Sequence, residues 1–190
     1  MVSPNFIYTK KILTPEQCNG IIDVFESHPD KYREGFVGNS IVNLSVKEST
    51  DFCFHLGEKQ FIQRAYGDLI DIVIDKLTDC ISDYKYKFEI LHEFNLEIDE
   101  FNLQKYLPGQ GFKKWHSEQR PGDIRVFVWM VYLNDVPDGG TEFLYQEHTE
   151  KAEQGKLVFF PADWTYTHRG QVSHTTTKYI LTGWIVETGR

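Results

Sequence analysis

Apolar residues recur with two different periods along the chain. Over residues 15–26 and again over 59–84 they return every three to four positions, which places them on one face of a helix. Beyond residue 94 the period changes to two, which is typical of β-strands. Helices followed by a run of strands predict an α+β domain, with the helices on one side of a mainly antiparallel sheet or barrel.

The first predicted helix has clear signals at both ends. Thr14 fits the N-cap position, Pro15 fits the first helical position, and Gln17 completes a capping box. Residues 27–30 contain a proline and should end this helix. The second predicted helix contains Gly67 but no proline, so we expect it to run without interruption.

The predicted strands extend to the end of the chain. Residues 124–133 are almost wholly apolar, which predicts a central strand buried on both faces. Residues 35–55 alternate only weakly, and we interpret them as short strands with a mobile loop around 47–51. We expect a turn over residues 134–140 and a solvated loop over 147–153. The other predicted strands are residues 6–8, 94–98, 101–106, 155–160 and 178–186.

Length and composition narrow the class of protein. The 190 residues contain no repeat, low-complexity tract or linker, so we expect a single domain over 1–190 with a sizeable core. Hydrophobic residues make up 41% and charged residues 25%, an ordinary globular composition. The net charge of −8 disfavours nucleic-acid and anionic-membrane partners, because phosphate groups would be repelled.

The cysteines and the N-terminal residues bear on location. The chain has three cysteines, Cys18, Cys53 and Cys80. Their odd number and wide spacing argue against a disulfide framework and against a cysteine zinc site. We therefore expect free, mostly buried thiols in a reducing compartment. The first residues lack the apolar run of a signal peptide, and no run reaches membrane-spanning length. These features predict a cytoplasmic protein.

The segment KKWHSEQRPG, residues 113–122, holds a histidine and a carboxylate two positions apart, His116 and Glu118. Alone, this pattern is short enough to arise by chance and favours a solvated polar loop before the turn at Pro121 over a metal site. About fifty residues later, PADWTYTHRG supplies His168. Two histidines and one carboxylate form the facial triad of non-haem Fe(II) oxygenases, and the lack of a nearby thiolate argues against structural zinc.

Lys178 follows His168 by ten residues and opens the last predicted strand. A dicarboxylate that chelates the metal at one end needs a cation at the other, and a lysine supplies that point charge. An anionic ligand would offset the cost of burying an unpaired lysine. Tyr106, Tyr132 and Thr182 lie on neighbouring predicted strands and offer neutral hydrogen bonds, although the two tyrosines fit plain core packing equally well.

His174 competes with His168 for the third ligand position. It lies only four residues before Lys178 among serine and threonine residues, where we expect an exposed connection. Residues 164–167 can instead extend as a strand and carry His168 inward, so we favour His168. We interpret the remaining histidines as surface or packing residues: His28, His55, His92 and His148.

Four pieces of the chain together resemble the prolyl 4-hydroxylase branch of the Fe(II)/2-oxoglutarate dioxygenases: YLPGQGFKKWHSE, VYLNDVPDGGTEF, GKLVFFP and THRG…KYILTGW. The earlier segment KILTPEQCNGIIDVFE resembles that family's opening helix. The resemblance implies a double-stranded β-helix (jelly-roll) core with N-terminal flanking helices. It also implies a loop over the substrate, which we assign to residues 46–53. The implied iron ligands are His116, Glu118 and His168, with Lys178, Tyr106, Tyr132 and Thr182 on 2-oxoglutarate.

The expected activity is an Fe(II)- and 2-oxoglutarate-dependent dioxygenase that hydroxylates a C–H bond, with succinate and CO2 as co-products. The resemblance implies a peptidyl proline as target, a peptide or protein substrate, O2 as oxidant, and ascorbate as a candidate addition. Two positions depart from the family pattern: Glu118 replaces the usual aspartate, and Thr176 replaces a glycine, which argues against a close match to collagen-type enzymes. A non-catalytic jelly-roll binding module is the alternative. Halogenation is disfavoured because Glu118 fills the carboxylate position.

Overall fold

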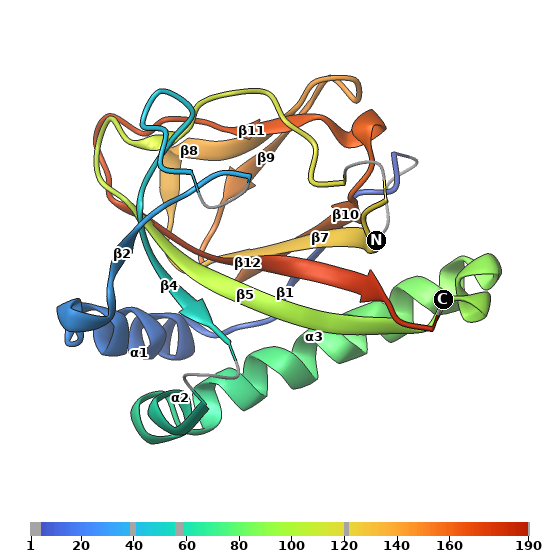
Figure 1. The fold of residues 1–190 in the computed structure, drawn as a ribbon, viewed down its shortest axis with the longest axis horizontal. Coiled ribbons are helices and arrows are strands. Elements are labelled where there is room, and N and C mark those ends of the chain that lie inside the picture. Colours follow the sequence, from blue (N-terminus) through green and yellow to red (C-terminus); the bar gives the residue numbers. More distant parts are fainter. Residues whose placement is uncertain (1–4, 39–40, 56–58, 120–121, 190) are drawn as a thin grey trace.

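The computed structural model describes residues 5–38, 41–55, 59–119 and 122–189. Two antiparallel sheets face each other, and the helices cover the outer side of the larger sheet (Figure 1). The helices of the described residues are α1 (Pro15–Glu26), α2 (Lys59–Ala65) and α3 (Asp68–Lys87). Short 3-10 turns lie at Pro29–Lys31 after α1, at Glu89–Glu93 after α3, and at Trp164–Tyr166 near the end of the chain. This arrangement confirms the expected α+β fold, with N-terminal helices flanking two facing antiparallel sheets.

The capping box at the start of α1 is confirmed. The hydroxyl of Thr14 accepts a hydrogen bond from the Gln17 backbone N–H, and the Gln17 side chain accepts one from the Thr14 backbone N–H. The helix ends at Glu26, with Ser27 as its C-cap.

The expectation of one uninterrupted second helix is wrong. The helical conformation is interrupted at Gly67, whose φ of +50° lies in the left-handed region that favours glycine. Just before this break, Tyr66 is buried and packs against Phe52 and Phe54 of the sheet. The break therefore lets α2 and α3 follow different directions while keeping the tyrosine in the core.

Within the described residues, twelve strands build the sheets. Their bounds are β1 (Tyr8–Lys11), β2 (Arg33–Glu34), β3 (Lys47–Glu48), β4 (Thr50–Phe54), β5 (Leu96–Tyr106), β6 (Gly111–Phe112), β7 (Arg125–Tyr132), β8 (Val136–Phe143), β9 (His148–Ala152), β10 (Lys156–Pro161), β11 (His168–Gly170) and β12 (Lys178–Glu187). The large sheet has the order β1-β10-β7-β12-β5-β4-β2, the small sheet the order β11-β8-β9, and β3 pairs with β6.

The strand predictions are partly confirmed. The apolar strand β7 is central, lying between β10 and β12, as its composition predicts. The two strands expected over 94–106 form the single strand β5. The expected turn at 134–140 and loop at 147–153 instead contribute to β8 and β9. Residues 164–166 form a 3-10 turn rather than a strand. Pro121, where we expected a turn, lies outside the described residues.

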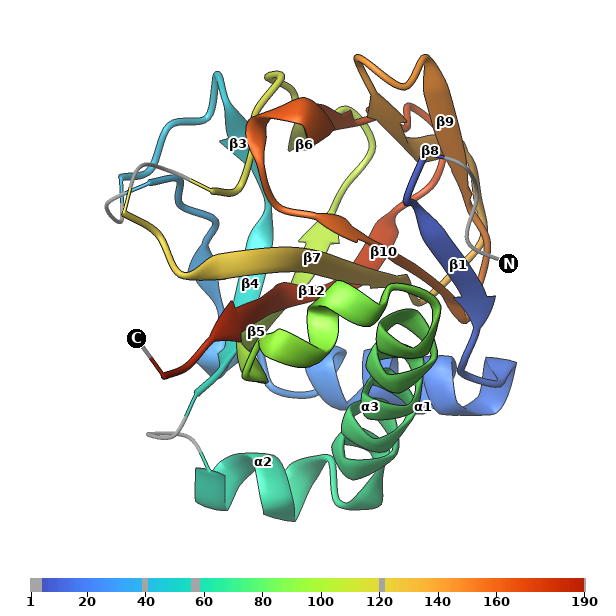
Figure 2. The ribbon, with the colours of Figure 1, turned by 90° about the vertical axis from the view of Figure 1, so that its right-hand side faces the viewer.

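Side chains alternate between the two faces along most of the large sheet, with register shifts near the end of β12. On β12, Leu181 joins the apolar cluster beneath α1 and α3, whereas Ile180 and Thr182 face the small sheet. On β5, Leu103 points to the helices and Asn102 points the opposite way. Figure 2 shows the helices packed below the large sheet, with the small sheet and the β3–β6 pair on its other side. The space between the sheets is where the predicted site residues meet.

None of the helices in the described ranges is long and apolar enough to cross a membrane.

Candidate active site

A pair of backbone hydrogen bonds brings the two predicted histidine ligands side by side. His116 lies four residues beyond β6, and His168 opens β11. The backbone N–H of His116 donates to the carbonyl of His168 at 3.0 Å, and the reverse hydrogen bond is 2.9 Å long. This bridge joins residues that are 52 positions apart in the sequence, so the pairing of the β6 and β11 regions brings the two histidines together.

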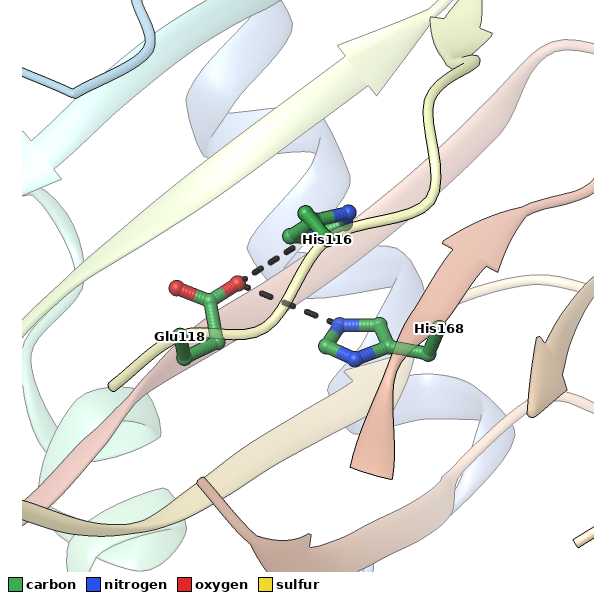
Figure 3. A group of neighbouring side chains, drawn as sticks. All are labelled: His116, Glu118 and His168. Atoms are coloured by element: carbon green, nitrogen blue, oxygen red, sulfur yellow. Dashed lines mark ion pairs between the residues drawn. The ribbon is translucent and has the colours of Figure 1, made fainter. Parts of the chain in front are cut away.

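Glu118 completes a cluster of three potential metal ligands. One carboxylate oxygen, Oε1, lies 3.2 Å from Nε2 of His116 and 3.9 Å from Nε2 of His168 (Figure 3). The ligand atoms of the three residues all lie within 4.8 Å of one another. His174 is exposed, its backbone N–H is bound by Asp138, and it does not belong to this cluster.

The hydrogen bonds of the imidazoles suit metal binding. Nδ1 of His116 lies 3.0 Å from the carbonyl oxygen of Lys114, and Nδ1 of His168 lies 2.9 Å from that of Tyr166. A carbonyl oxygen only accepts, so in each neutral ring Nδ1 carries the proton and Nε2 keeps its lone pair. Both Nε2 atoms lie near Oε1 of Glu118, so the three potential ligand atoms converge on one point, and the backbone carbonyls orient the rings as they do around metal-binding histidines.

The electrostatics favour the metal-binding protonation states. Burial, followed by the proximity of His116, lowers the pKa of His168 to about 4, although Glu118 and the Tyr166 carbonyl act in the opposite direction. Burial tends to raise the pKa of Glu118, but contacts with the two histidines and with Trp184 lower it to about 2. Near neutral pH the cluster therefore offers a neutral imidazole at His168 and an ionised carboxylate.

The same cavity holds the other predicted site residues. It has a volume of about 980 Å³ and is lined by Tyr106, Tyr132, Lys178 and Thr182 as well as by the three potential metal ligands. Their placement around one cavity agrees with the prediction, while their roles as iron and 2-oxoglutarate ligands stay predictions.

Lys178 is a buried cation with spare hydrogen-bonding capacity. Its ammonium donates to the carbonyl oxygens of Gly139 and Gln171, each at 2.9 Å, and its side chain forms no ion pair among the described residues. Three donors minus these two leave one N–H available. Burial lowers the pKa of Lys178 to about 8, with Asp138 partly offsetting this effect. The arrangement suits an anionic group bound in the cavity.

The neutral polar residues have partners that sequence reasoning missed. The hydroxyl of Tyr132 lies 2.6 Å from that of Thr141, and the hydroxyl of Tyr106 donates to Gln104 at 2.6 Å. Thr182 donates to the backbone carbonyl of Trp129 at 3.0 Å. Thr141 and Gln104 both line the cavity, but neither has a signal in the sequence beyond its place on an alternating strand.

The two glycines of β8 allow a close approach of strands, rather than forming the turn expected there. A Cβ atom at Gly140 would overlap the carbonyl oxygen of Glu150 on the neighbouring strand β9. The carbonyl of Gly139 is one of the two acceptors for Lys178. The pair therefore belongs to the wall that holds the buried lysine.

The segment expected to be a loop is instead ordered by a buried ion pair. Lys47 and Asp51 are each about 5% exposed or less at the side chain, and their charged atoms lie 2.6 Å apart. Ser49 donates to the same carboxylate at 2.7 Å. Residues 47–48 form β3 and residues 50–54 form β4, so the loop interpretation is wrong. Lys47 and Asp51 do line the cavity, so the expectation that this segment borders the site is confirmed.

Comparison with known proteins agrees with this geometry. Residues 101–186 match the model of the 2OG-Fe(II) oxygenase superfamily. Over 129 residues the chain is 26% identical to "Probable prolyl 4-hydroxylase 10" from Arabidopsis thaliana, a match that spans 67% of this chain and 40% of that protein.

Solved structures share the fold at low sequence identity. The viral collagen prolyl hydroxylase of Paramecium bursaria Chlorella virus-1, in a 2-oxoglutarate complex, is 18% identical with a TM-score of 0.69, covering 97% of this chain and 98% of that one. A Trichoplax adhaerens prolyl hydroxylase bound to a hypoxia-inducible-factor peptide is 14% identical with a TM-score of 0.80, covering 97% and 84%.

The triad geometry and the family match point to the same cofactors, Fe(II) and 2-oxoglutarate. The resemblance seen in the sequence is confirmed: residues 101–186 match the 2OG-Fe(II) oxygenase superfamily, and the chain is prolyl 4-hydroxylase-like by its sequence and structural neighbours.

Proposed function

We propose that this protein is an Fe(II)- and 2-oxoglutarate-dependent dioxygenase that hydroxylates a C–H bond of a peptidyl proline. The observation that carries this proposal is the placement of the three metal ligands and the spare cation Lys178 in one cavity. The chain spans about two fifths of its curated relative, with 40% of that protein covered, so the activity rests on this site rather than on the length of the match.

His116, Glu118 and His168 would hold the metal through two neutral imidazoles and a carboxylate. Fe(II), together with bound 2-oxoglutarate and dioxygen, supplies the oxidising chemistry for C–H hydroxylation. The protein has to orient the co-substrate and keep water from the reacting groups.

Different residues of the cavity wall serve these two tasks. Lys178 and the Tyr132–Thr141 hydroxyl pair offer a charge and neutral hydrogen bonds to the distal carboxylate of 2-oxoglutarate. Val128 and Met130 line the same cavity with apolar surface, which excludes water around the bound molecule. An apolar cavity with a few converging polar groups is typical of small-molecule sites.

A peptide substrate is supported by the extent of the cavity and by the neighbours. Apart from the triad, the cavity is lined by Asn102 of β5, Arg33 of β2 and Trp115, the residue before His116. The Trichoplax neighbour binds a hypoxia-inducible-factor peptide, and the viral neighbour is a collagen prolyl hydroxylase. The open length beyond the metal ligands gives room for residues that flank a target proline.

The test is a product search with defined peptides. Purified protein, Fe(II), 2-oxoglutarate and O2 are incubated with proline-containing peptides of the collagen and hypoxia-inducible-factor types. We expect a gain of one oxygen mass on proline, with one succinate formed for each hydroxylation, and neither product from His168→Ala. Succinate formation with no modified proline in any peptide would reject proline as the target while leaving the dioxygenase assignment.

A non-catalytic jelly-roll binding module is the second candidate, because Glu118 departs from the aspartate usual in the family. This candidate predicts metal or 2-oxoglutarate binding without succinate. The spare buried cation at Lys178 favours the enzyme, since a plain binding module does not need it. A cytoplasmic location stays a prediction.

A further inference from the structure

The carboxylate of Glu118 is held at both of its oxygens by different partners. Oε1 faces the two imidazoles, at 3.2 Å from His116 and 3.9 Å from His168. Oε2 accepts a hydrogen bond from the indole N–H of Trp184 at 3.1 Å. A glutamate has one more rotatable bond than an aspartate, so its carboxylate needs more restraint to present one particular oxygen.

Trp184 is itself fixed by a stacked arginine. The guanidinium of Arg125 lies 3.9 Å from the centre of the indole ring, and its NH1 group donates to the backbone carbonyl of Glu118 at 3.1 Å. NH1 also lies 3.9 Å from Oε2 of Glu118 and 3.8 Å from the carboxylate of Asp123. Arg125 therefore touches both the backbone of the glutamate and the ring that holds its side chain.

The indole hydrogen bond is specific to this position in the sheet. Trp129, on the adjacent strand β7, is fully buried, and its indole N–H has no hydrogen-bond partner among the described residues. An indole N–H can only donate, and a bond from it to a carboxylate is charge-assisted and stronger than a neutral one. Trp184 thus contributes a directed donor to Glu118, whereas Trp129 contributes packing alone.

We propose that Trp184 is a positioning residue, which holds Oε2 of Glu118 so that Oε1 alone is presented with the two imidazoles to the metal. This inference rests on the proposed function, because it concerns the same metal site. It explains how the chain uses a glutamate at this position. The hydrogen bond from the indole restrains the longer side chain, and the stacked guanidinium of Arg125 keeps the indole in place.

The test is an anaerobic equilibrium titration with Fe(II). Trp184→Phe keeps an aromatic ring for Arg125 to stack on and removes only the N–H donor. We expect it to weaken Fe(II) binding by about 10–100-fold, the usual effect of losing a partner that orients a metal ligand. Trp164→Phe makes the same change at a tryptophan that is 69% exposed and should bind Fe(II) like the wild type. Thermal melting is measured in parallel, because a purely structural role lowers stability without changing the Fe(II) affinity of the folded protein.

Repeating the Trp184 substitution in a Glu118→Asp variant shows whether Trp184 acts through the carboxylate of Glu118. Glu118→Asp shortens the side chain and draws its oxygen away from the indole. In that background, Trp184→Phe should change Fe(II) affinity much less than in the wild type, because the two residues no longer interact. The same fold-change in both backgrounds would show that Trp184 does not act through Glu118 and would overturn the inference.

The outcomes separate the two proposals. If the wild type binds Fe(II) and folded Trp184→Phe binds it equally well, the positioning inference fails and the proposed function stands. If the wild type binds no Fe(II), both fail. Should Trp184→Phe not fold, the indole N–H signals of the ¹⁵N-labelled wild type and Glu118→Gln are compared. Loss of the carboxylate must shift the Trp184 signal, and an unmoved signal contradicts the inference.

Discussion

The two faces of the large sheet come from the same strands but carry different side chains. The face toward α1 and α3 is a continuous apolar cluster in which Leu103, Trp129 and Leu181 are all fully buried. The opposite face changes along the sheet. Val128 and Met130 of β7 are apolar, whereas Asn102 of β5, Asp51 of β4 and Lys178 of β12 present polar or charged groups to the cavity.

This difference separates stability from binding within single strands. Burying a large apolar side chain contributes about 1.5–3 kcal/mol to folding, so the helix-facing residues stabilise the domain. Polar groups buried on the other face cost free energy unless they find partners. Lys47 and Asp51 form an ion pair with each other, whereas Lys178 keeps one spare N–H donor and has a lowered pKa. A ligand site needs buried polar groups that still have hydrogen-bonding capacity, held in place by a rigid sheet.

The largest expected effect comes from the third metal ligand. His168→Ala should abolish Fe(II) binding, because two remaining ligands no longer form the triad. His174→Ala should leave binding close to that of the wild type, since this residue is exposed and lies outside the cluster. Anaerobic Fe(II) titration of both variants is the measurement. Loss of the metal in His174→Ala with retention in His168→Ala would reverse the assignment.

The buried cation should matter next. Lys178→Met keeps much of the side-chain volume and removes the charge, which should weaken 2-oxoglutarate binding by about 2–5 kcal/mol, or about 30- to several thousand-fold. Lys151→Met is the matched control, because Lys151 is exposed on β9. Calorimetric titration with 2-oxoglutarate in the presence of Fe(II) measures the effect. An unchanged affinity in Lys178→Met would remove this lysine from the site.

Two neighbouring residues of β5 test the division between the faces directly. Leu103→Ala removes a fully buried, helix-facing side chain and should lower the free energy of unfolding by about 2–5 kcal/mol. Asn102→Ala, on the cavity face, loses one hydrogen bond with Arg33 and should cost less than about 1.5 kcal/mol. Urea unfolding gives both values. Equal losses would mean that the two faces do not differ in their contribution to stability.

The smallest effect is on pH dependence. Burial lowers the pKa of Lys178 from its ordinary 10.5 to about 8, so the free protein loses this positive charge as pH rises through about 8. A dicarboxylate favours the protonated lysine, so 2-oxoglutarate affinity should be constant below that pH and fall above it, by at most about tenfold per pH unit. The same titration in Lys178→Met should be flat over this range. A slope that survives in the variant would assign the pH dependence to another group.

Much of the site could be predicted because its residues sit at positions that sequence patterns mark. The capping signals of Thr14 and Gln17, the apolar run of β7 and the spacing of His116, Glu118, His168 and Lys178 are all local or near-local features. The structure then brings the distant pieces together through strand pairing, including the bridge between the two histidines.

What could not be predicted depends on contacts between residues far apart or on paired charges. Residues 47–51 look like a mobile loop because they are polar, but Lys47 and Asp51 are buried by pairing with each other. Gly140 resembles a turn residue, and only the nearby carbonyl of Glu150 shows that it permits close strand packing. The indole of Trp184 reaches Glu118 across 66 positions of sequence, which no spacing rule indicates.

The most direct test of the account is succinate formation from 2-oxoglutarate by the purified wild-type protein, measured with and without added Fe(II). The cavity that holds the triad and Lys178 predicts succinate that depends on Fe(II) and O2 and is lost in His168→Ala. The prediction is contradicted if the wild-type protein binds Fe(II) and 2-oxoglutarate but forms no succinate, whether or not a peptide is added. In that case the polar face of the sheet would serve binding alone.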